Sequence, residues 1–144
     1  MKKRHAAREL ALQTLYACEI GSEEDNQRVF DTLAENAGYA DDVRDYAWRL
    51  VAVTWPARKR LDERIGSHAA NWHITRMAVI DRNVLRLAVA ELESCPDTPA
   101  RVVMDEAVEL AKTYGTEESS RFVNGVIDSV FRGMSRPAPP EQIK

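Results

Sequence analysis

Apolar residues recur at intervals of three and four along almost the whole chain, and this spacing is the period of an amphipathic α-helix. Strict alternation of apolar and polar residues, which would indicate strands, is scarce. Glycine and proline residues are few and fall mostly between the periodic segments, where one helix ends and the next begins. The pattern therefore predicts an all-α protein.

The periodic stretches predict about six or seven helices joined by short loops. They cover residues 4–20, 26–37, 43–54, 61–65, 77–92, 99–115 and 117–130. Such helices bury their apolar faces against one another, so we expect a compact helical bundle, organised as two sub-bundles that share a core. Pro56 is expected either to kink the third helix or to start a new one, because proline lacks the N–H that bonds back one turn.

Residues that favour helix ends stand at the borders of several stretches. Short polar side chains accept hydrogen bonds from the first N–H groups of a helix, and a left-handed glycine often follows the last turn. The expected end residues are Gly21 and Gly38 after the first two helices, Ser22 with Asp25 before the second, Asp41 before the third, Thr98 with Pro99 before the sixth and Thr116 before the last. We expect one helical domain over residues 1–134 and a flexible proline-bearing tail over residues 135–144.

The composition is that of a globular domain. The chain has 144 residues, of which 44% are hydrophobic and 30% charged, with a net charge of −3. No apolar run approaches the roughly 20 residues needed to span a bilayer, and no secretion signal follows the basic N-terminus. Cys18 and Cys95 form no CxxC pair, so we expect a buried free thiol at Cys18 and neither a disulfide framework nor a zinc site. These features predict a cytoplasmic protein with no membrane association.

Positive charge gathers at the N-terminus of this otherwise acidic chain. The first eight residues include Lys2, Lys3, Arg4, His5 and Arg8 and no acid. On a helix Arg4 and Arg8 are one turn apart, and Tyr16 lies two turns beyond Arg8. Such cations suit phosphate groups, and the aromatic ring can stack on an unpaired RNA base. The alternative is a basic terminus that is simply solvated.

A second basic group mixes charges of both signs. It contains Arg58, Lys59, Arg60 and Arg64, interleaved with Asp62 and Glu63. Opposite charges at helical spacing are typical of a solvated face whose side chains pair with one another, so we expect a self-paired face here.

No constellation of residues indicates catalysis or a metal site. His68 and His73 are five positions apart, off one another's helical face, and no carboxylate or cysteine completes a ligand set. Glu106 and Glu109 are one turn apart, but the Glu-x-x-His pattern of di-iron bundles is missing, so we expect them to face solvent. The sequence has no glycine-rich phosphate loop and no nucleophile motif. We therefore expect no enzyme activity, no cofactor and no metal.

Three segments of the chain resemble the NusB family. The first is the opening helix, RHAARELALQTLY at residues 4–16. The second is IDRNVLRLAVAEL at residues 80–92, preceded by Asn71 and Trp72. The third and most specific joins VMDEAVELAKTYG at residues 103–115 to Ser119 and FVNGVID at residues 122–128. The resemblance spans residues 4–132, with residues 22–67 matching in pattern rather than in motif.

The resemblance implies a fold of two helical sub-bundles and a role in transcription antitermination. It implies binding to the single-stranded boxA element of nascent ribosomal RNA, with the ribosomal small-subunit protein NusE as partner, in an assembly that helps RNA polymerase read through terminators. By position, the implied RNA-binding residues are Lys3, Arg4, His5, Arg8, Tyr16, Glu118 and Phe122. The implied NusE-binding residues are Arg76, Ile80, Asp81 and Val84.

Three of these residues have structural alternatives. Phe122 lies in line with Val126 and Val130, so core packing explains it equally well. Tyr16 also flanks the apolar face of its helix, with a hydroxyl that can reach outward. Asp81 can simply begin or cap its helix, a position that aspartate favours.

Two other functions are open at the level of the sequence. The opening helix has His5, Ala6 and Ala7 where the family carries more arginine, which favours a protein-interaction module that kept its partner surface and lost RNA binding. A related helical domain precedes RNA cytosine methyltransferases. That class needs a long catalytic region after the helices, where the tail is expected here.

Overall fold

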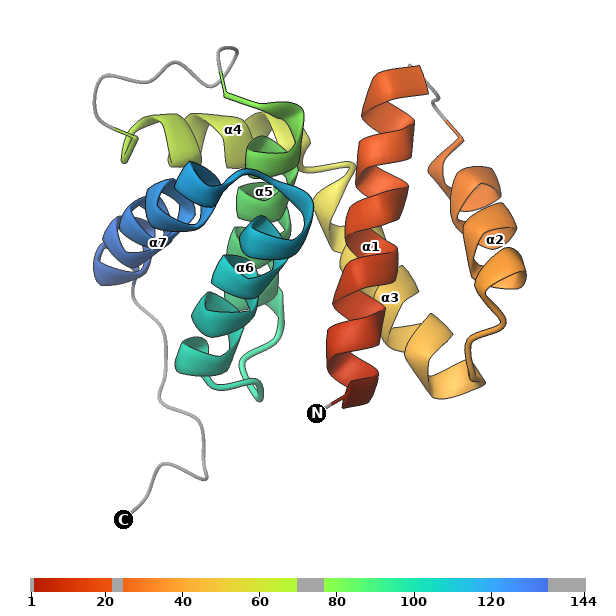
Figure 1. The fold of residues 1–144 in the computed structure, drawn as a ribbon. Coiled ribbons are helices and arrows are strands. Elements are labelled where there is room, and N and C mark those ends of the chain that lie inside the picture. The colour runs from red at the N-terminus through yellow and green to blue at the C-terminus, as the bar shows by residue number, and fades with distance from the viewer. Residues whose placement is uncertain (1, 22–24, 70–76, 135–144) are drawn as a thin grey trace. The chain divides into compact units, whose positions relative to one another are not determined.

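The computed structural model describes residues 2–21, 25–69 and 77–134 of the 144-residue chain. Within these ranges the chain forms seven helices and no strand (Figure 1), which confirms the predicted all-α fold. The helices are α1 (Lys2–Gly21), α2 (Asn26–Ala37), α3 (Asp41–Thr54), α4 (Arg58–Gly66), α5 (Val79–Ser94), α6 (Ala100–Tyr114) and α7 (Glu117–Arg132). The predicted tail, His73 and Arg76 lie outside the described residues.

The chain divides into two compact units, Met1–Ala57 and Arg58–Lys144. The first unit contains α1 to α3, and the second contains α4 to α7. Pro56 lies between α3 and α4, so it neither kinks α3 nor begins α4. The ladder of helical hydrogen bonds cannot continue through its missing N–H, and the N–H of Ala57 instead closes a turn on the carbonyl of Thr54 at 3.2 Å. A proline therefore stands at the border between the units.

In the first unit, α1 contacts both α2 and α3. The buried apolar residues of α1 are Ala7, Leu10, Ala11, Leu12, Leu15 and Cys18. The buried residues of α3 include Ala47, Leu50 and Val51. Phe30 of α2 lies against Trp48 of α3, with ring centroids 5.2 Å apart. Lys3 and Arg4 are exposed and burial begins at Ala7 among the side chains that the structure describes, so this part of the helix lies at the surface.

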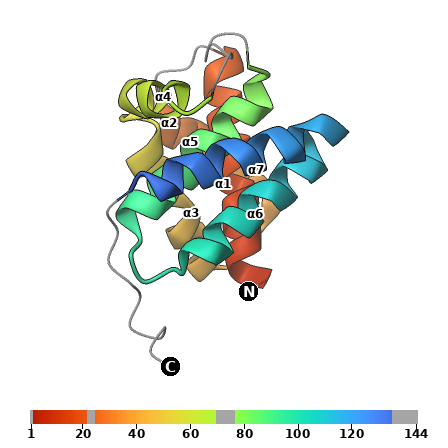
Figure 2. The same cartoon turned by 90° about the vertical axis from the view of Figure 1, so that its left-hand side faces the viewer.

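In the second unit, α5 contacts α4, α6 and α7, and Figure 2 shows α7 lying over α5 and α6. Every residue of α5 from Asn83 to Leu92 is buried. Polar groups on a helix covered on all sides need partners within the protein. Arg86 donates to both carboxylate oxygens of Asp62 in α4, at 2.6 and 2.7 Å, and to Asn83 Oδ1 at 3.0 Å.

Several predicted helix ends are confirmed. Asp25 precedes α2 and accepts a hydrogen bond from the N–H of Arg28 at 3.1 Å. Gly38 follows α2 with a φ of 69°, in the left-handed region that glycine tolerates best. Thr116 precedes α7, and its N–H donates to Ser119 Oγ at 3.0 Å.

Three other end residues were predicted wrongly. Gly21 is the last residue of α1 and is not among the described glycines with positive φ. Asp41 is the first residue of α3 rather than its cap, because Ala40 is the residue with an extended backbone. Pro99 lies before α6 instead of in its first turn, since its ψ of 138° is not helical, and it takes the capping position expected of Thr98.

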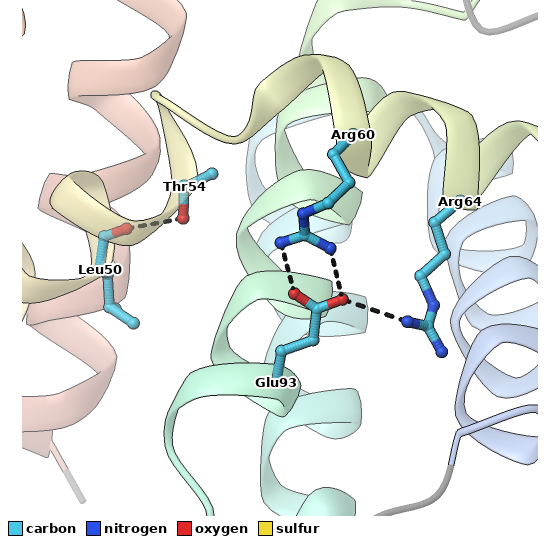
Figure 3. A network of polar contacts seen from close by, with 5 residues as sticks. All are labelled: Leu50, Thr54, Arg60, Arg64 and Glu93. Carbon is cyan, nitrogen blue, oxygen red and sulfur yellow. Dashed lines mark hydrogen bonds and ion pairs between the residues drawn. The ribbon is translucent and has the colours of Figure 1, made fainter.

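Two arginines of the second basic group are paired, but with a carboxylate of another helix (Figure 3). Arg60 of α4 donates to the two carboxylate oxygens of Glu93 in α5 at 2.9 and 3.1 Å, and Arg64 donates to the same carboxylate at 3.3 Å. The hydrogen bond to Glu93 raises the pKa of Arg60. The expected partner Asp62 binds Arg86 of α5 instead. Arg60 and Arg64 are therefore already paired within the second unit.

Two other kinds of feature are absent from the described residues. No helix there is long and apolar enough to cross a membrane. No three histidine, cysteine, aspartate or glutamate side chains in those ranges lie close enough to hold a metal ion. Cys18 is a buried free thiol, as predicted, and so is Cys95.

Candidate nucleic-acid interface

The first turn of α1 presents Lys3 and Arg4 to solvent. This turn contains no acidic residue, so no carboxylate of the turn itself offsets the combined charge of the cations and the positive end of the helix dipole. The offset comes from α3, where Asp42 Oδ2 lies 2.8 Å from Lys3 Nζ. The start of α1 is therefore tied to the first turn of α3 by an ion pair.

Asp42 is held by two donors. Its Oδ1 accepts from the N–H of Val43 at 2.9 Å, and its Oδ2 accepts from Lys3. The hydrogen bond with Lys3 lowers the pKa of Asp42 and raises the pKa of Lys3. The side chains of Lys3 and Asp42 are 73% and 55% exposed, and ion pairs this exposed are weak. A phosphate group can therefore compete with Asp42 for Lys3.

Arg4 is stacked on an aromatic ring of α3. Its guanidinium carbon lies 3.7 Å from the centre of the Tyr46 ring, and Tyr46 is itself buried. A cation–π contact occupies the face of the guanidinium and leaves the N–H groups along its edge. These N–H groups bind phosphate oxygens in a bidentate way. Tyr46 thus holds Arg4 in an orientation that suits an anion.

The other predicted residues of α1 have different environments. His5 Nε2 lies 3.5 Å from Glu9 Oε2, so the two form an ion pair when the ring is protonated. Arg8 is only 3% exposed, so Arg4 and Arg8 do not share the exposed face that their spacing suggested. α1 is covered on most sides from Ala7 onward, and Arg8 lies within that covered part. Tyr16 is 39% exposed, which leaves part of its ring available for stacking.

A cavity of about 340 Å³ lies between the start of α1 and α3, within the first unit. It is lined by Lys3, Arg4, Asp42, Asp45, Tyr46 and Arg49. The four lining residues from α3 were not predicted as site residues, and three of them are Asp42, Tyr46 and Arg49. Their spacing of four and three positions indicates one helical face, and this signal was present in the sequence. The sequence carried no signal that this face of α3 lies close to the start of α1.

A second cavity, of about 120 Å³, lies between the start of α5 and the start of α7, within the second unit. It is lined by Met77, Ala78, Asp81, Thr116, Glu118, Ser119 and Phe122. The resemblance assigned Asp81 to the NusE surface, and Glu118 and Phe122 to the RNA surface. The structure places all three residues around one cavity.

Asp81 has a buried oxygen with no hydrogen-bond partner. The residue is 9% exposed, and its Oδ1 is the buried side-chain atom that lacks a partner among the described residues. Such an atom has lost water without gaining a donor, which costs about 1–3 kcal/mol. Asp81 lies in the first turn of α5, but the N-cap of that helix is Ala78, so capping does not explain it. A hydrogen-bond donor from a bound partner would satisfy Asp81 Oδ1.

The remaining predicted residues differ in exposure. Phe122 is half-buried at the second cavity, whereas Val126, on the same face of α7, is buried. Ile80 is partly exposed. Val84 is fully buried, because α5 is covered on all sides at that point, so it offers no surface for direct contact. Arg76 falls outside the described residues.

These observations define a class of protein: a small all-α chain of two helical units whose first helix begins with exposed cations. The chain matches the NusB family over residues 5–132, and it belongs to this family. The resemblance predicted from the three sequence segments is thereby confirmed.

Relatives described as transcription antitermination protein NusB are similar over nearly the whole chain. The protein from Sorangium cellulosum is 43% identical over 136 residues, which covers 94% of this chain and 96% of the relative. The protein from Myxococcus xanthus is 41% identical over 140 residues, which covers 95% of this chain and 100% of the relative.

Solved structures share the fold. T. maritima NusB superimposes with a TM-score of 0.86 at 33% identity, covering 96% of this chain and 94% of that one. A chain in a crystal structure of the antitermination factors NusB and NusE in complex with dsRNA gives a TM-score of 0.85 at 30% identity, covering 93% of this chain and 99% of that one.

Proposed function

We propose that this protein is a transcription antitermination factor that binds boxA-type single-stranded RNA of nascent ribosomal RNA together with the ribosomal protein NusE. In this role it helps RNA polymerase read through terminators. The observation that carries the proposal is the pair of exposed cations Lys3 and Arg4, with Arg4 oriented by Tyr46, on a chain whose net charge is −3. A local basic patch attracts phosphate even where the overall charge of the protein does not.

The comparisons support the same function. The relatives similar over nearly the whole chain are described as transcription antitermination proteins. One structural neighbour was crystallised with NusE and double-stranded RNA. Because single-stranded RNA exposes base edges that a duplex hides, the two forms of RNA are distinguishable partners and both belong in the test.

In this proposal the residues of α1 have distinct roles. Lys3 and Arg4 bind phosphate groups, and His5 adds positive charge when it is protonated. Tyr16 stacks on an unpaired base through the exposed part of its ring. Arg8 is only 3% exposed, which leaves almost none of its side chain for direct contact with RNA.

In this proposal the cavity of the second unit recognises bases or NusE through hydrogen bonds, and it does not bind phosphate groups. Glu118 and Asp81 present carboxyl oxygens, which accept hydrogen bonds from base amino groups or from N–H groups of NusE. Phe122 contributes an aromatic ring to the lining of the same cavity. Ile80 contributes apolar contact with NusE, and Val84, which is buried, contributes to this surface only through the packing of α5. Arg76 completes the NusE surface by its place in the sequence.

The protein acts by binding and not by catalysis, and it acts in the cytoplasm, where nascent ribosomal RNA and NusE are found together. The family relatives are described as antitermination proteins, a role in which the partner assembly, and not a chemical step, produces the effect.

Titration of a fluorescent boxA-like RNA with the full chain, with and without NusE, tests the proposal. We expect NusE to strengthen binding, and we expect boxA-like RNA to bind more tightly than a scrambled RNA or a duplex. The logarithm of the affinity should fall with the logarithm of salt concentration by about 0.7 for each phosphate contacted. No binding to any RNA, even with NusE present, would reject the function.

A paired set of variants assigns the binding to α1. The double variant Lys3→Gln and Arg4→Gln should weaken binding to boxA-like and scrambled RNA alike, because phosphate contacts carry no sequence information. The matched control replaces two exposed cations of α6, Arg101→Gln and Lys112→Gln. Equal affinities for the two double variants would exclude the start of α1 as the RNA surface.

The second candidate is a protein-interaction module that binds NusE and not RNA. The observation that favours it is the occupation of the basic residues by the protein itself: Lys3 pairs with Asp42, His5 lies beside Glu9, and Arg8 is buried. The same titration separates the candidates, because this module would bind NusE normally while RNA affinity stayed at background.

A further inference from the structure

Arg49 lines the same cavity as Lys3 and Arg4, although it comes from α3 and from a part of the chain outside the three matching motifs. Its side chain is exposed, and it lies one turn beyond Tyr46, the residue on which Arg4 is stacked. The cavity thus brings together cations from α1 and α3, two helices that are separated in the sequence by α2.

The charges around this cavity suit a single phosphate group. Three cations, Lys3, Arg4 and Arg49, and two carboxylates, Asp42 and Asp45, line it. A surface that follows a row of phosphates would carry cations alone, since each carboxylate repels the backbone. Arg4 is held by Tyr46 with its N–H edge free of the ring, and a planar guanidinium binds a phosphate through such an edge.

Asp42 occupies Lys3 when no phosphate is present. Loss of Lys3 would not leave Asp42 without hydrogen bonds, because its other oxygen accepts from the N–H of Val43 at 2.9 Å. The exchange of Asp42 for phosphate at Lys3 therefore breaks one exposed ion pair and forms another. Asp42 lowers the affinity of the cavity for phosphate without closing it.

We infer that this cavity binds one phosphate of the RNA chain, with Arg49 as a contact on α3 in addition to those of α1, and with Asp42 as a competitor for Lys3. The inference deepens the proposed function and rests on it. It assigns α3 a part in RNA binding and gives opposite roles to two charged residues of that helix.

The test compares two pairs of α3 variants in the full chain, by titration of the fluorescent boxA-like RNA in the presence of NusE. Arg49→Gln should weaken binding about two- to fivefold, as loss of one exposed charge contact does, and should reduce the salt slope by about 0.7. Its control is Arg44→Gln, an α3 cation that lies near Asp31 of α2 and does not line the cavity.

Asp42→Asn should strengthen binding about twofold, because Lys3 no longer has a charged competitor. Its control is Asp41→Asn, which removes the same charge from the neighbouring exposed position outside the cavity. A role for these residues in stability alone would not tighten RNA binding, and thermal unfolding of each variant measures that role separately.

The outcomes separate this inference from the proposed function. If the unmodified protein binds RNA and Arg49→Gln behaves like Arg44→Gln, the cavity is not a phosphate site, while the proposed function stands. If Asp42→Asn and Asp41→Asn bind RNA with equal affinity, Asp42 is not a competitor for Lys3, while the proposed function again stands. If the unmodified protein does not bind RNA at all, both the function and the cavity's role are overturned.

Discussion

Arg86 of α5 and Asp62 of α4 form a bidentate ion pair, with Nε–Oδ1 and Nη2–Oδ2 distances of 2.6 and 2.7 Å. Arg86 is 6% exposed, and its third contact is to Asn83 Oδ1. Asn83 in turn donates to the carbonyl of Val79 at 3.0 Å. The pair therefore fixes α4 against α5 through a short chain of hydrogen bonds in which each polar group has a partner.

Replacing Arg86 by alanine should lower the free energy of unfolding by about 2–4 kcal/mol, because Asp62 and Asn83 then lose the donors that satisfy them. Urea denaturation measures the change. The matched control is Arg101→Ala, since Arg101 and Asp105 form a pair whose side chains are 85% and 70% exposed. The control should change stability by less than about 0.5 kcal/mol. Equal effects of the two variants would contradict a structural role for Arg86.

Gly115 joins α6 to α7 at a point where a side chain does not fit. A Cβ atom there would lie 2.6 Å from Ser119 Oγ and 2.8 Å from the carbonyl oxygen of Ala111. Gly115→Ala should therefore destabilise the protein by about 1–3 kcal/mol, measured by thermal or urea unfolding. Gly125→Ala is the control, because Gly125 is exposed within α7 and has open space around it. That substitution should raise the free energy of unfolding by about 0.5–1 kcal/mol. A loss of stability in Gly125→Ala would contradict the explanation that the space around the added Cβ atom decides the effect.

The Lys3–Asp42 pair should depend on pH in a defined direction. The pKa of Asp42 is lowered, so the pair is present above the ordinary carboxyl pKa and is lost as the pH falls through the lowered value. The pKa of Lys3 is raised, so the pair is also lost as the pH rises through that raised value. NMR titration of the Asp42 carboxyl should give a midpoint that moves upward in Lys3→Gln and does not move in Lys112→Gln. An unmoved midpoint in Lys3→Gln would mean that the pair does not form in solution.

Asp81→Ala should separate binding from stability. Loss of the unpartnered oxygen relieves a desolvation cost, while loss of a carboxyl group from the first turn of α5 removes a favourable contact with the helix dipole. These effects oppose each other, so the free energy of unfolding should change by less than about 1 kcal/mol. Affinity for RNA with NusE should nevertheless fall, by about tenfold if an external donor satisfies the oxygen.

The control for Asp81 is Asp128→Ala, which removes a carboxylate of α7 that pairs with Arg132 on the surface. Neither stability nor RNA affinity should change much in this variant. A large loss of stability in Asp81→Ala, or unchanged affinity with NusE, would show that Asp81 has a structural role and no ligand.

The helices and several of their ends were predictable because they depend on neighbours along the chain. The spacing of apolar residues identified each helix, and Asp25, Gly38 and Thr116 were recognised as end residues from local chemistry. The errors at Asp41 and Pro99 were of a single position. Helix ends depend on a few backbone angles that several adjacent residues can satisfy equally well.

Contacts between helices could not be predicted from the sequence in the same way. The sequence placed Arg60 and Asp62 on one helix of mixed charge, but their partners Glu93 and Arg86 are on α5. The spacing of Arg4 and Arg8 suggested a shared exposed face, yet Arg8 is buried. Helical periodicity shows which residues share a face, and it does not show which other helix covers that face.

From the sequence alone came the all-α class, the family and the concentration of cations at the start of the chain, since these follow from composition, local periodicity and motif spacing. Tertiary structure alone brought Tyr46 beneath Arg4 and placed Asp81 beside Phe122. Each of these pairs joins residues that are roughly forty positions apart in the sequence. Such contacts arise from the packing of whole helices, which minimises exposed apolar surface over the entire unit rather than over any one segment.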